Sequence, residues 1–201
     1  MSATVRAISA RKQINREQYD AVLLDLDGVI TNTANLHAAC WNEMFDEYLR
    51  KRAAEQGEIF RPFDLSTDYR LYVDGKPRLD GVRDFLESRG IRLSEGHPND
   101  PPQAETIAGL GNRKNELFGR IIEEAGVRPY EGSVALIKQL RRDGFKIAVV
   151  TSSENCLAIL KAAKLDAFFD VRVDGATIRA HGLAGKPAPD GVFDGGKAAG
   201  G

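Results

Sequence analysis

Three apolar runs in the sequence have the length and the flanking residues of buried strands. They are AVLLDLD at 21–27, FKIAVV at 145–150 and VRVDG at 171–175. Runs of this kind, without strict alternation, are typical of strands covered on both faces in a parallel sheet. We therefore predict strands near 22–26, 146–150 and 170–174, with two acids at the C-terminal end of the first.

Helical spacing governs most of the remaining chain. Thr33 can cap a helix that Gly57 ends, and its apolar side chains recur every four residues, at Leu36, Cys40, Met44 and Tyr48. Further helices are predicted over 79–88, from about 103 to Gly126, from a cap at Ser133 to Gly144, and over 155–164. Residues 90–102 are rich in breakers and predict a loop.

Strands and helices alternate on both sides of a long, mostly helical stretch, which indicates an α/β fold. We predict a Rossmann-like parallel core, formed by residues 20–33 and 128–201, with a helical cap inserted at 34–127. The polar residues 1–19 offer little surface to bury and are expected to form a flexible lead.

Composition indicates which kinds of binding partner and which cellular compartment to expect. The chain has 201 residues, 42% of them hydrophobic, and Lys+Arg 28 against Asp+Glu 29 leaves a net charge of -1. This balance predicts neither a nucleic-acid nor a membrane partner. Cys40 and Cys156 lie in apolar settings and are expected to be reduced core residues, and the chain shows no apolar run of membrane length, so we expect a cytoplasmic protein.

The two acids after the first strand, Asp25 and Asp27, suit phosphoryl transfer. A carboxylate can accept a phosphoryl group if cations neutralise the charge and a second acid handles the leaving group's proton. Thr151 and Ser152 end the next strand and can hold phosphate oxygens, and Lys186 can supply a fixed positive charge. A pair of acids alone is weak support, because such pairs often only cap a helix or lie in a solvated turn.

Three segments together carry a family resemblance: DLDGVITNTANLH, VVTSSEN and GKPAPD. In this order and spacing they resemble the first three motifs of the haloacid dehalogenase superfamily, over residues 20–193. The insert resembles the helical cap of its first subclass, in particular that of the β-phosphoglucomutase group. The resemblance implies that Asp25 is nucleophile and metal ligand, and that Asp27 is general acid/base with its backbone carbonyl on Mg²⁺.

The same resemblance implies the residues that bind the substrate. Thr151, Ser153 and Asn155 would contact phosphate, in addition to Ser152 and Lys186, which their chemistry already assigns to the site. His37 and Trp41 fall where the group has its His and Trp, the GKPR stretch places Gly75 and Arg78 in the sugar-phosphate loop, and Lys114 matches a cap segment. His37 can equally be a half-buried helix position, and Lys76, Arg78 and Lys114 can equally be solvated charges.

The C-terminal end departs from the family pattern. The family carries further acids on a fourth strand after the lysine motif, whereas here GKPAPDGVF runs into DGGKAAGG, which lacks the apolar face of a helix. We expect an incomplete core sheet, an incomplete Mg²⁺ shell, and self-association through the exposed edge of the first strand. A truncated chain and a natural short form remain open.

These observations predict an enzyme acting on a small sugar phosphate through an aspartyl-phosphate intermediate. A β-phosphoglucomutase-like conversion of β-glucose 1-phosphate to glucose 6-phosphate is favoured, with a phosphatase as the alternative. From another class, a catalytically incomplete domain that binds a phosphorylated ligand or a partner chain remains open.

Overall fold

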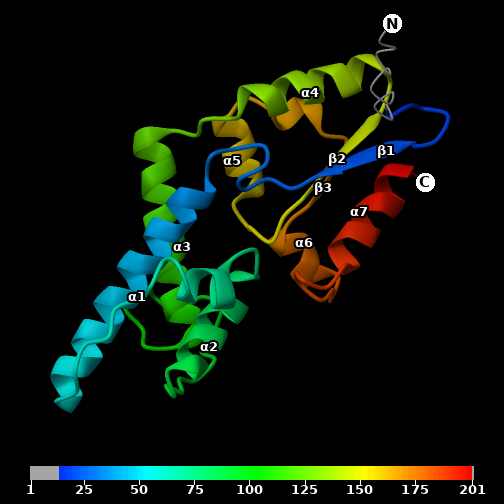
Figure 1. The fold of residues 1–201 in the computed structure, drawn as a ribbon. Helices are drawn as coiled ribbons and strands as arrows, with labels where there is room; N and C mark the ends of the chain where they lie inside the picture. The colour runs from blue at the N-terminus through cyan, green and yellow to red at the C-terminus, as the bar shows by residue number, and fades with distance from the viewer. Residues whose placement is uncertain (1–13, 201) are drawn as a thin grey trace, which may run out of the picture.

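A small parallel sheet lies at one end of the molecule (Figure 1). The computed structural model describes residues 14–200, so most of the predicted lead lies outside the described residues. Strands β1 (Ala21–Leu24), β2 (Lys146–Val150) and β3 (Val171–Val173) pair in that order, all parallel, with Ala21 opposite Lys146. The predicted α/β class and the strand positions are confirmed.

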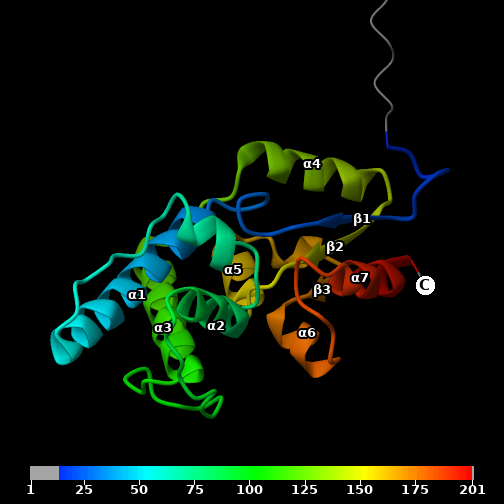
Figure 2. The same ribbon diagram turned by 60° about the horizontal axis from the view of Figure 1, so that its bottom comes forward.

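Two helices cover opposite faces of this sheet, α4 (Glu131–Arg142) and α7 (Asp190–Gly200) (Figure 2). Side chains of β1 alternate between them, because Val22 and Leu24 pack into the main core while Leu23 faces the smaller cluster of Val150 and Val173. All four β1 residues are half-buried rather than buried. Within the described residues β1 pairs only with β2, and self-association through its other edge stays a prediction.

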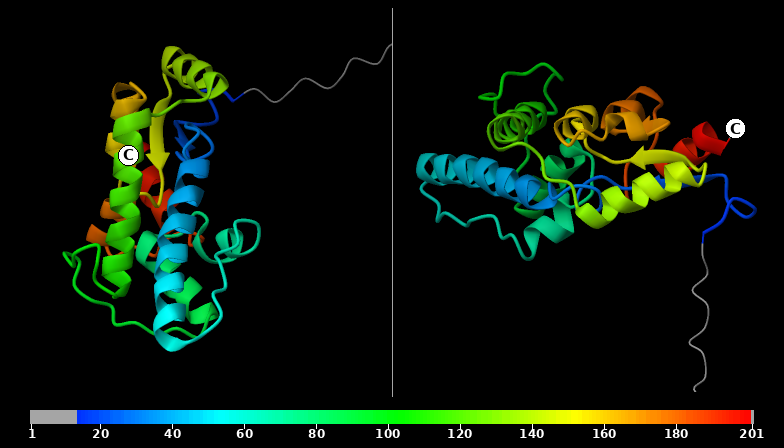
Figure 3. Two further views of the ribbon diagram at one scale, coloured as in Figure 1. Left: turned by 90° about the vertical axis from the view of Figure 1, so that its left-hand side faces the viewer. Right: turned by 90° about the horizontal axis from the view of Figure 1, so that it is seen from above.

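The helices between β1 and α4 pack against one another. Helices α1 (Ala34–Gln56) and α3 (Ile107–Ala125) run side by side, and α2 (Arg78–Ser88) packs on α3 and on the π-helical turn η1 (Tyr69–Val73) (Figure 3). Their core is an aromatic cluster of Phe45, Phe63 and Phe85. We call residues 34–127 the insert; its standing as a separate domain stays a prediction.

The helix boundaries show where local patterns were sufficient. Gly57 ends α1 in the left-handed conformation at φ 68, as its position predicted. Ser133, predicted as a cap, lies inside α4, and its hydroxyl donates to the Val29 carbonyl at 2.6 Å. Thr33 precedes α1 but makes no side-chain cap bond, because its hydroxyl is used in the site described below.

Beyond Thr151, the chain forms α5 (Cys156–Ala162), a 3₁₀ turn η2 (Asp166–Phe168), and α6 (Gly175–Ala180) before α7. The prediction that the last stretch lacks a helical face was wrong. Gly191, Gly195 and Ala199 are buried, and a Cβ at Gly195 would lie 3.0 Å from Val150 Cγ2. These small residues let α7 lie close on the sheet. The face that α7 turns to the sheet is therefore flat and carries few large apolar side chains.

Cys40 and Cys156 are both buried and free, as their apolar settings indicated. No helix in the described part of the chain combines the length and the apolar character that crossing a bilayer requires.

Candidate active site

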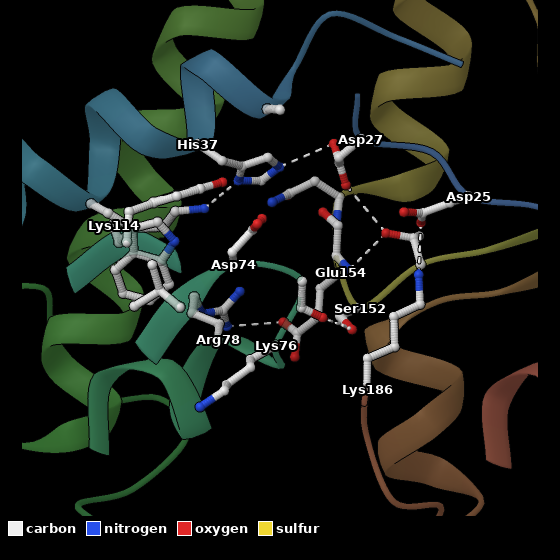
Figure 4. A pocket seen from close by; sticks show the side chains of 18 residues that line it. Asp25, Asp27, His37, Asp74, Lys76, Arg78, Lys114, Ser152, Glu154 and Lys186 are labelled. Carbon is white, nitrogen blue, oxygen red and sulfur yellow. Dashed lines mark hydrogen bonds and ion pairs between the residues drawn. The ribbon is translucent and has the colours of Figure 1, made fainter. Parts of the chain in front are cut away.

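The carboxyl ends of β1 and β2 open into a pocket that the insert closes from the other side (Figure 4). Asp25 and Asp27 follow β1, and Thr151 follows β2, so parallel pairing brings them to the same edge of the sheet. Lys186 reaches this edge from the loop between α6 and α7. The sheet therefore gathers two acids, a hydroxyl and a cation from segments far apart in sequence.

Asp25 faces Lys186 directly. Lys186 Nζ donates to Asp25 Oδ1 at 2.8 Å and to the Val150 carbonyl at 3.2 Å, which fixes the ammonium group at the end of β2. The Asp25 side chain is 41% exposed. A carboxylate held by one cation, with its second oxygen open to the pocket, is placed to attack an electrophile.

Asp27 is more enclosed and has three polar neighbours. Its Oδ1 accepts from Thr33 Oγ1 at 2.5 Å, its Oδ2 accepts from Thr151 Oγ1 at 3.2 Å, and His37 Nε2 lies 3.2 Å from Oδ1. Burial by itself would raise the pKa of Asp27, but His37 and the two hydroxyls outweigh it and lower the pKa. Asp27 is therefore a carboxylate, ready to accept a proton.

Behind Asp27, the insert contributes a buried pair. Lys114 Nζ lies 2.5 Å from His37 Nδ1, and its ammonium group faces the rings of Trp41 at 5.2 Å and Phe118 at 4.8 Å. Burial lowers the pKa of Lys114 to about 8. Burial and then the Lys114 charge also lower the pKa of His37, so its ring is neutral at pH 7.

The neutral ring of His37 has one N–H. Because Lys114 donates to Nδ1, the hydrogen-bond network assigns the proton to Nε2, which points toward Asp27. Nε2 lies 3.2 Å from Asp27 Oδ1 but outside hydrogen-bond geometry, so the contact is electrostatic. The insert thus orients a polarised N–H toward the second acid.

The other end of the pocket is built around Arg78. Its Nη1 donates to Asn115 Oδ1 at 3.1 Å and its Nη2 donates to Glu154 Oε2 at 2.9 Å. Asn155 Nδ2 donates to the same Asn115 oxygen at 2.8 Å. Arg78 Nε is buried without a hydrogen-bond partner among the described residues. We call this Arg78 end the distal end of the pocket.

Loop contacts hold the insert against the core beside this pocket. Ser152 Oγ donates to the Gly75 carbonyl at 2.7 Å. A Cβ at Gly185 would lie 2.1 Å from Pro77 Cγ, so only glycine fits where the lysine-bearing loop meets the insert. In this structure the insert is therefore closed against the core beside the pocket.

The sequence matches a known protein family over most of its length. The model of the haloacid dehalogenase-like hydrolases matches residues 19–200. The chain belongs to this family. The β-phosphoglucomutase of Mycobacterium tuberculosis (strain CDC 1551 / Oshkosh) is 49% identical over 174 residues, which are 87% of this chain and 66% of that protein. The β-phosphoglucomutase of Bacillus subtilis is 32% identical over 173 residues, which are 85% of this chain and 65% of that protein.

The chain thus spans slightly less than two thirds of the length of these relatives. Solved structures of other proteins share the fold. β-Phosphoglucomutase from Clostridium difficile superposes with a TM-score of 0.69 at 22% identity, covering 90% of this chain and 70% of that one. CbbY from Rhodobacter sphaeroides gives 0.62 at 24% identity, covering 89% and 72%.

Every predicted site residue lines the one pocket, although the chemical role of each stays a prediction. The residues are Asp25, Asp27, His37, Trp41, Gly75, Arg78, Lys114, Thr151, Ser152, Ser153, Asn155 and Lys186. The Ser153 hydroxyl accepts a hydrogen bond from the backbone N–H of Asn155 at 3.2 Å, which forms a local turn at the pocket wall. Arg113, next to Lys114, points away and donates to the Pro102 carbonyl.

Sequence reasoning missed four residues of the site. Glu154 lies inside the VVTSSEN motif, where its acidic side chain between two predicted phosphate contacts was an available signal. Tyr69 and Asp74 line the pocket from η1 and the turn that follows it, and no periodic pattern marked this segment. Thr33 was read as a helix cap although its hydroxyl serves Asp27.

Few side-chain oxygens of the pocket are free to bind a divalent metal. Both Asp27 oxygens are engaged by Thr33 and Thr151, and one Asp25 oxygen is engaged by Lys186. No group of three or more His, Cys, Asp or Glu side chains gathers as a metal site within residues 14–200. Mg²⁺ requires octahedral oxygen ligation, so these residues do not complete a shell for it.

Proposed function

We propose that this chain transfers a phosphoryl group on a small sugar phosphate, with Asp25 as the nucleophile. The observation that carries the proposal is the opposition of Asp25 and Asp27 in one pocket, the first paired with Lys186 and the second held as a carboxylate. The two acids differ in exposure and in partners, which suits them to different tasks.

In the proposed reaction, an Asp25 oxygen attacks phosphorus as the bond from phosphorus to the sugar oxygen breaks, and the departing oxygen takes up a proton from solvent. In the second step a hydroxyl attacks the acyl phosphate, the Asp25–phosphorus bond breaks, and the hydroxyl proton passes to Asp27. Lys186 balances the negative charge that develops on the phosphoryl oxygens.

Either of two groups can accept the phosphoryl group from Asp25. A sugar hydroxyl as acceptor gives a phosphomutase, and water gives a phosphatase. Support for the mutase comes from relatives named β-phosphoglucomutase and from the contact of the insert with the core beside the pocket, which limits access of water. We therefore place conversion of β-glucose 1-phosphate to glucose 6-phosphate first and hydrolysis second.

Mg²⁺ is the usual cofactor of the family and is proposed here as well. The free oxygen of Asp25 and the backbone carbonyl of Asp27 would contact it, with substrate phosphate and water as the other ligands. It would supply charge neutralisation at the transferring group. The incomplete donor set predicts weak binding by residues 14–200.

Incubation with β-glucose 1-phosphate and Mg²⁺ tests the proposal, with glucose 6-phosphate and inorganic phosphate measured in parallel. Formation of glucose 6-phosphate supports the mutase. Release of inorganic phosphate without glucose 6-phosphate rules out the mutase and leaves the phosphatase. Absence of both products contradicts the enzymatic proposal for this chain.

A second candidate, from another class, is a domain that binds a phosphorylated ligand or a partner chain without turnover. The incomplete metal donor set favours it. Titration with Mg²⁺ by calorimetry separates the two: binding in the millimolar range together with turnover supports the enzyme, and absence of binding supports the binding domain.

A further inference from the structure

Glu154 is shared between two arginines, one in the pocket and one outside it. Its Oε2 accepts from Arg78 Nη2 at 2.9 Å, and its Oε1 accepts from Arg179 Nη1. The side chains differ in exposure, 15% for Arg78, 25% for Glu154 and 63% for Arg179. Arg78 and Glu154 line the pocket, whereas Arg179 belongs to α6 and does not line it (Figure 4).

The stem of Glu154 is held in place by the start of α6. A Cβ at Gly175 would lie 2.9 Å from Glu154 Cγ and 2.5 Å from the Ser152 carbonyl, so this helix begins directly against the loop. Arg179 follows four residues later, about one helical turn along. The stem of Glu154 is thus fixed, while its carboxylate lies between two guanidinium groups at the distal end of the pocket.

Glu154 compensates the charge that an anionic ligand would use. The other partner of Arg78 is Asn115, which is neutral, and the nearby Lys76 is engaged by Asp84 at 2.6 Å. Burial opposes the charge on Glu154, but Arg78 and Arg179 outweigh it and lower its pKa, so it stays ionised. An anion arriving at Arg78 must compete with a carboxylate that is already bound.

We propose that Glu154 is a specificity-determining residue that competes internally for Arg78 and moves onto Arg179 when a phosphate group of the substrate reaches the distal end. Phosphate presents more acceptor oxygens and charge than a sugar hydroxyl, so it displaces the carboxylate where a hydroxyl does not. The substrate class rests on the proposed function, but the competition itself does not need turnover.

The test measures binding of glucose 1,6-bisphosphate by calorimetry to protein that carries Asp25→Asn, which prevents turnover. Adding Glu154→Gln removes the competing charge and is expected to lower the Kd by about three- to thirtyfold. Adding Arg179→Gln instead leaves Glu154 with Arg78 alone and is expected to raise the Kd by about two- to tenfold. Circular dichroism on each variant verifies folding.

A double-mutant cycle identifies the site of action. With Arg78→Gln present, Glu154→Gln is expected to give no gain in affinity, because the cation that benefits is gone. Weaker or unchanged binding in Glu154→Gln, the same direction of change in both single variants, a gain that persists without Arg78, or no bisphosphate binding in any variant would overturn the proposal. Failure of the proposed function is seen separately, as missing turnover of β-glucose 1-phosphate by the unsubstituted chain.

Discussion

The two walls of the pocket are built in different ways. The core wall consists of residues that follow strand ends, Asp25, Asp27 and Thr151, together with Lys186, and of these Asp25 and Lys186 are the most open to the pocket. The insert wall consists of helix and loop residues, His37, Arg78 and Lys114, whose charges are mostly buried.

This difference separates chemistry from positioning. Asp25 on the core wall is exposed enough to react with a substrate, while burial lowers the pKa of both His37 and Lys114 on the insert wall. The walls meet at Asp27 beside His37 and at Glu154 beside Arg78. We expect substitutions on the core wall to lower kcat strongly and substitutions on the insert wall to change rate, affinity and pH dependence more moderately.

The largest effect is expected at the core wall, for Asp25→Asn. The amide has nearly the same shape but cannot form the acyl phosphate, so turnover of β-glucose 1-phosphate should fall by more than about 10³-fold. Thermal unfolding should be little changed, since the side chain is 41% exposed. Substantial residual activity would mean that another group is the nucleophile.

Asp27→Ala should rank second. Removing the carboxylate that exchanges protons with sugar oxygens should lower kcat by about 10²- to 10⁴-fold. Rapid mixing with p-nitrophenyl phosphate, whose leaving group needs no proton, sharpens the test, because the variant should still release about one equivalent of p-nitrophenolate in a burst before slow turnover. Loss of this burst together with the steady-state rate would assign Asp27 a structural role.

Lys114→Met tests the insert wall. Loss of the contact with His37 Nδ1 should misplace the imidazole beside Asp27 and lower kcat/KM by about 10- to 10²-fold, measured in steady-state assays. A loss as large as that of Asp25→Asn would break the distinction between the walls.

The same variant should change stability with a defined pH dependence. Because burial lowers the pKa of Lys114 to about 8, the unfolded chain binds more protons than the folded chain between pH 8 and the ordinary lysine value, so the parent gains stability as pH rises through that window. Lys114→Met lacks this dependence. At pH 7 the variant should therefore unfold at a Tm roughly 2–6 °C above that of the parent, and this difference should shrink toward pH 10. A difference in Tm that does not change with pH would contradict the buried charge.

The smallest effect is expected for Thr33→Val, where the walls join. The variant loses one donor to Asp27, so kcat should fall by about fivefold. Loss of this bond raises the pKa of Asp27, and activity that needs its carboxylate should therefore disappear at a higher pH on the acidic side. A pH–rate profile checks the direction; a limb that moves to lower pH, or stays, would contradict the assignment.

Local sequence patterns were sufficient for most elements. Period, glycine stops and apolar runs predicted the strands and the helices at α1, α2, α3 and α5 within a few residues. They failed at α7, where DGGKAAGG was interpreted as lacking the apolar face of a helix, although Gly195 allows close packing on Val150. Ser133 was also misassigned, because its hydroxyl bonds a distant carbonyl rather than its own helix.

The sequence by itself determined the order of strands and helices, the two acids at the end of β1, and the motif residues that converge on one pocket. Spacing carries this information because strand ends and helix faces follow from local backbone geometry. Only the tertiary structure decided the partners: Thr33 with Asp27, Lys114 with His37, and Glu154 between two arginines. These contacts join residues up to 77 positions apart, and their energetics depend on burial, which no local pattern records.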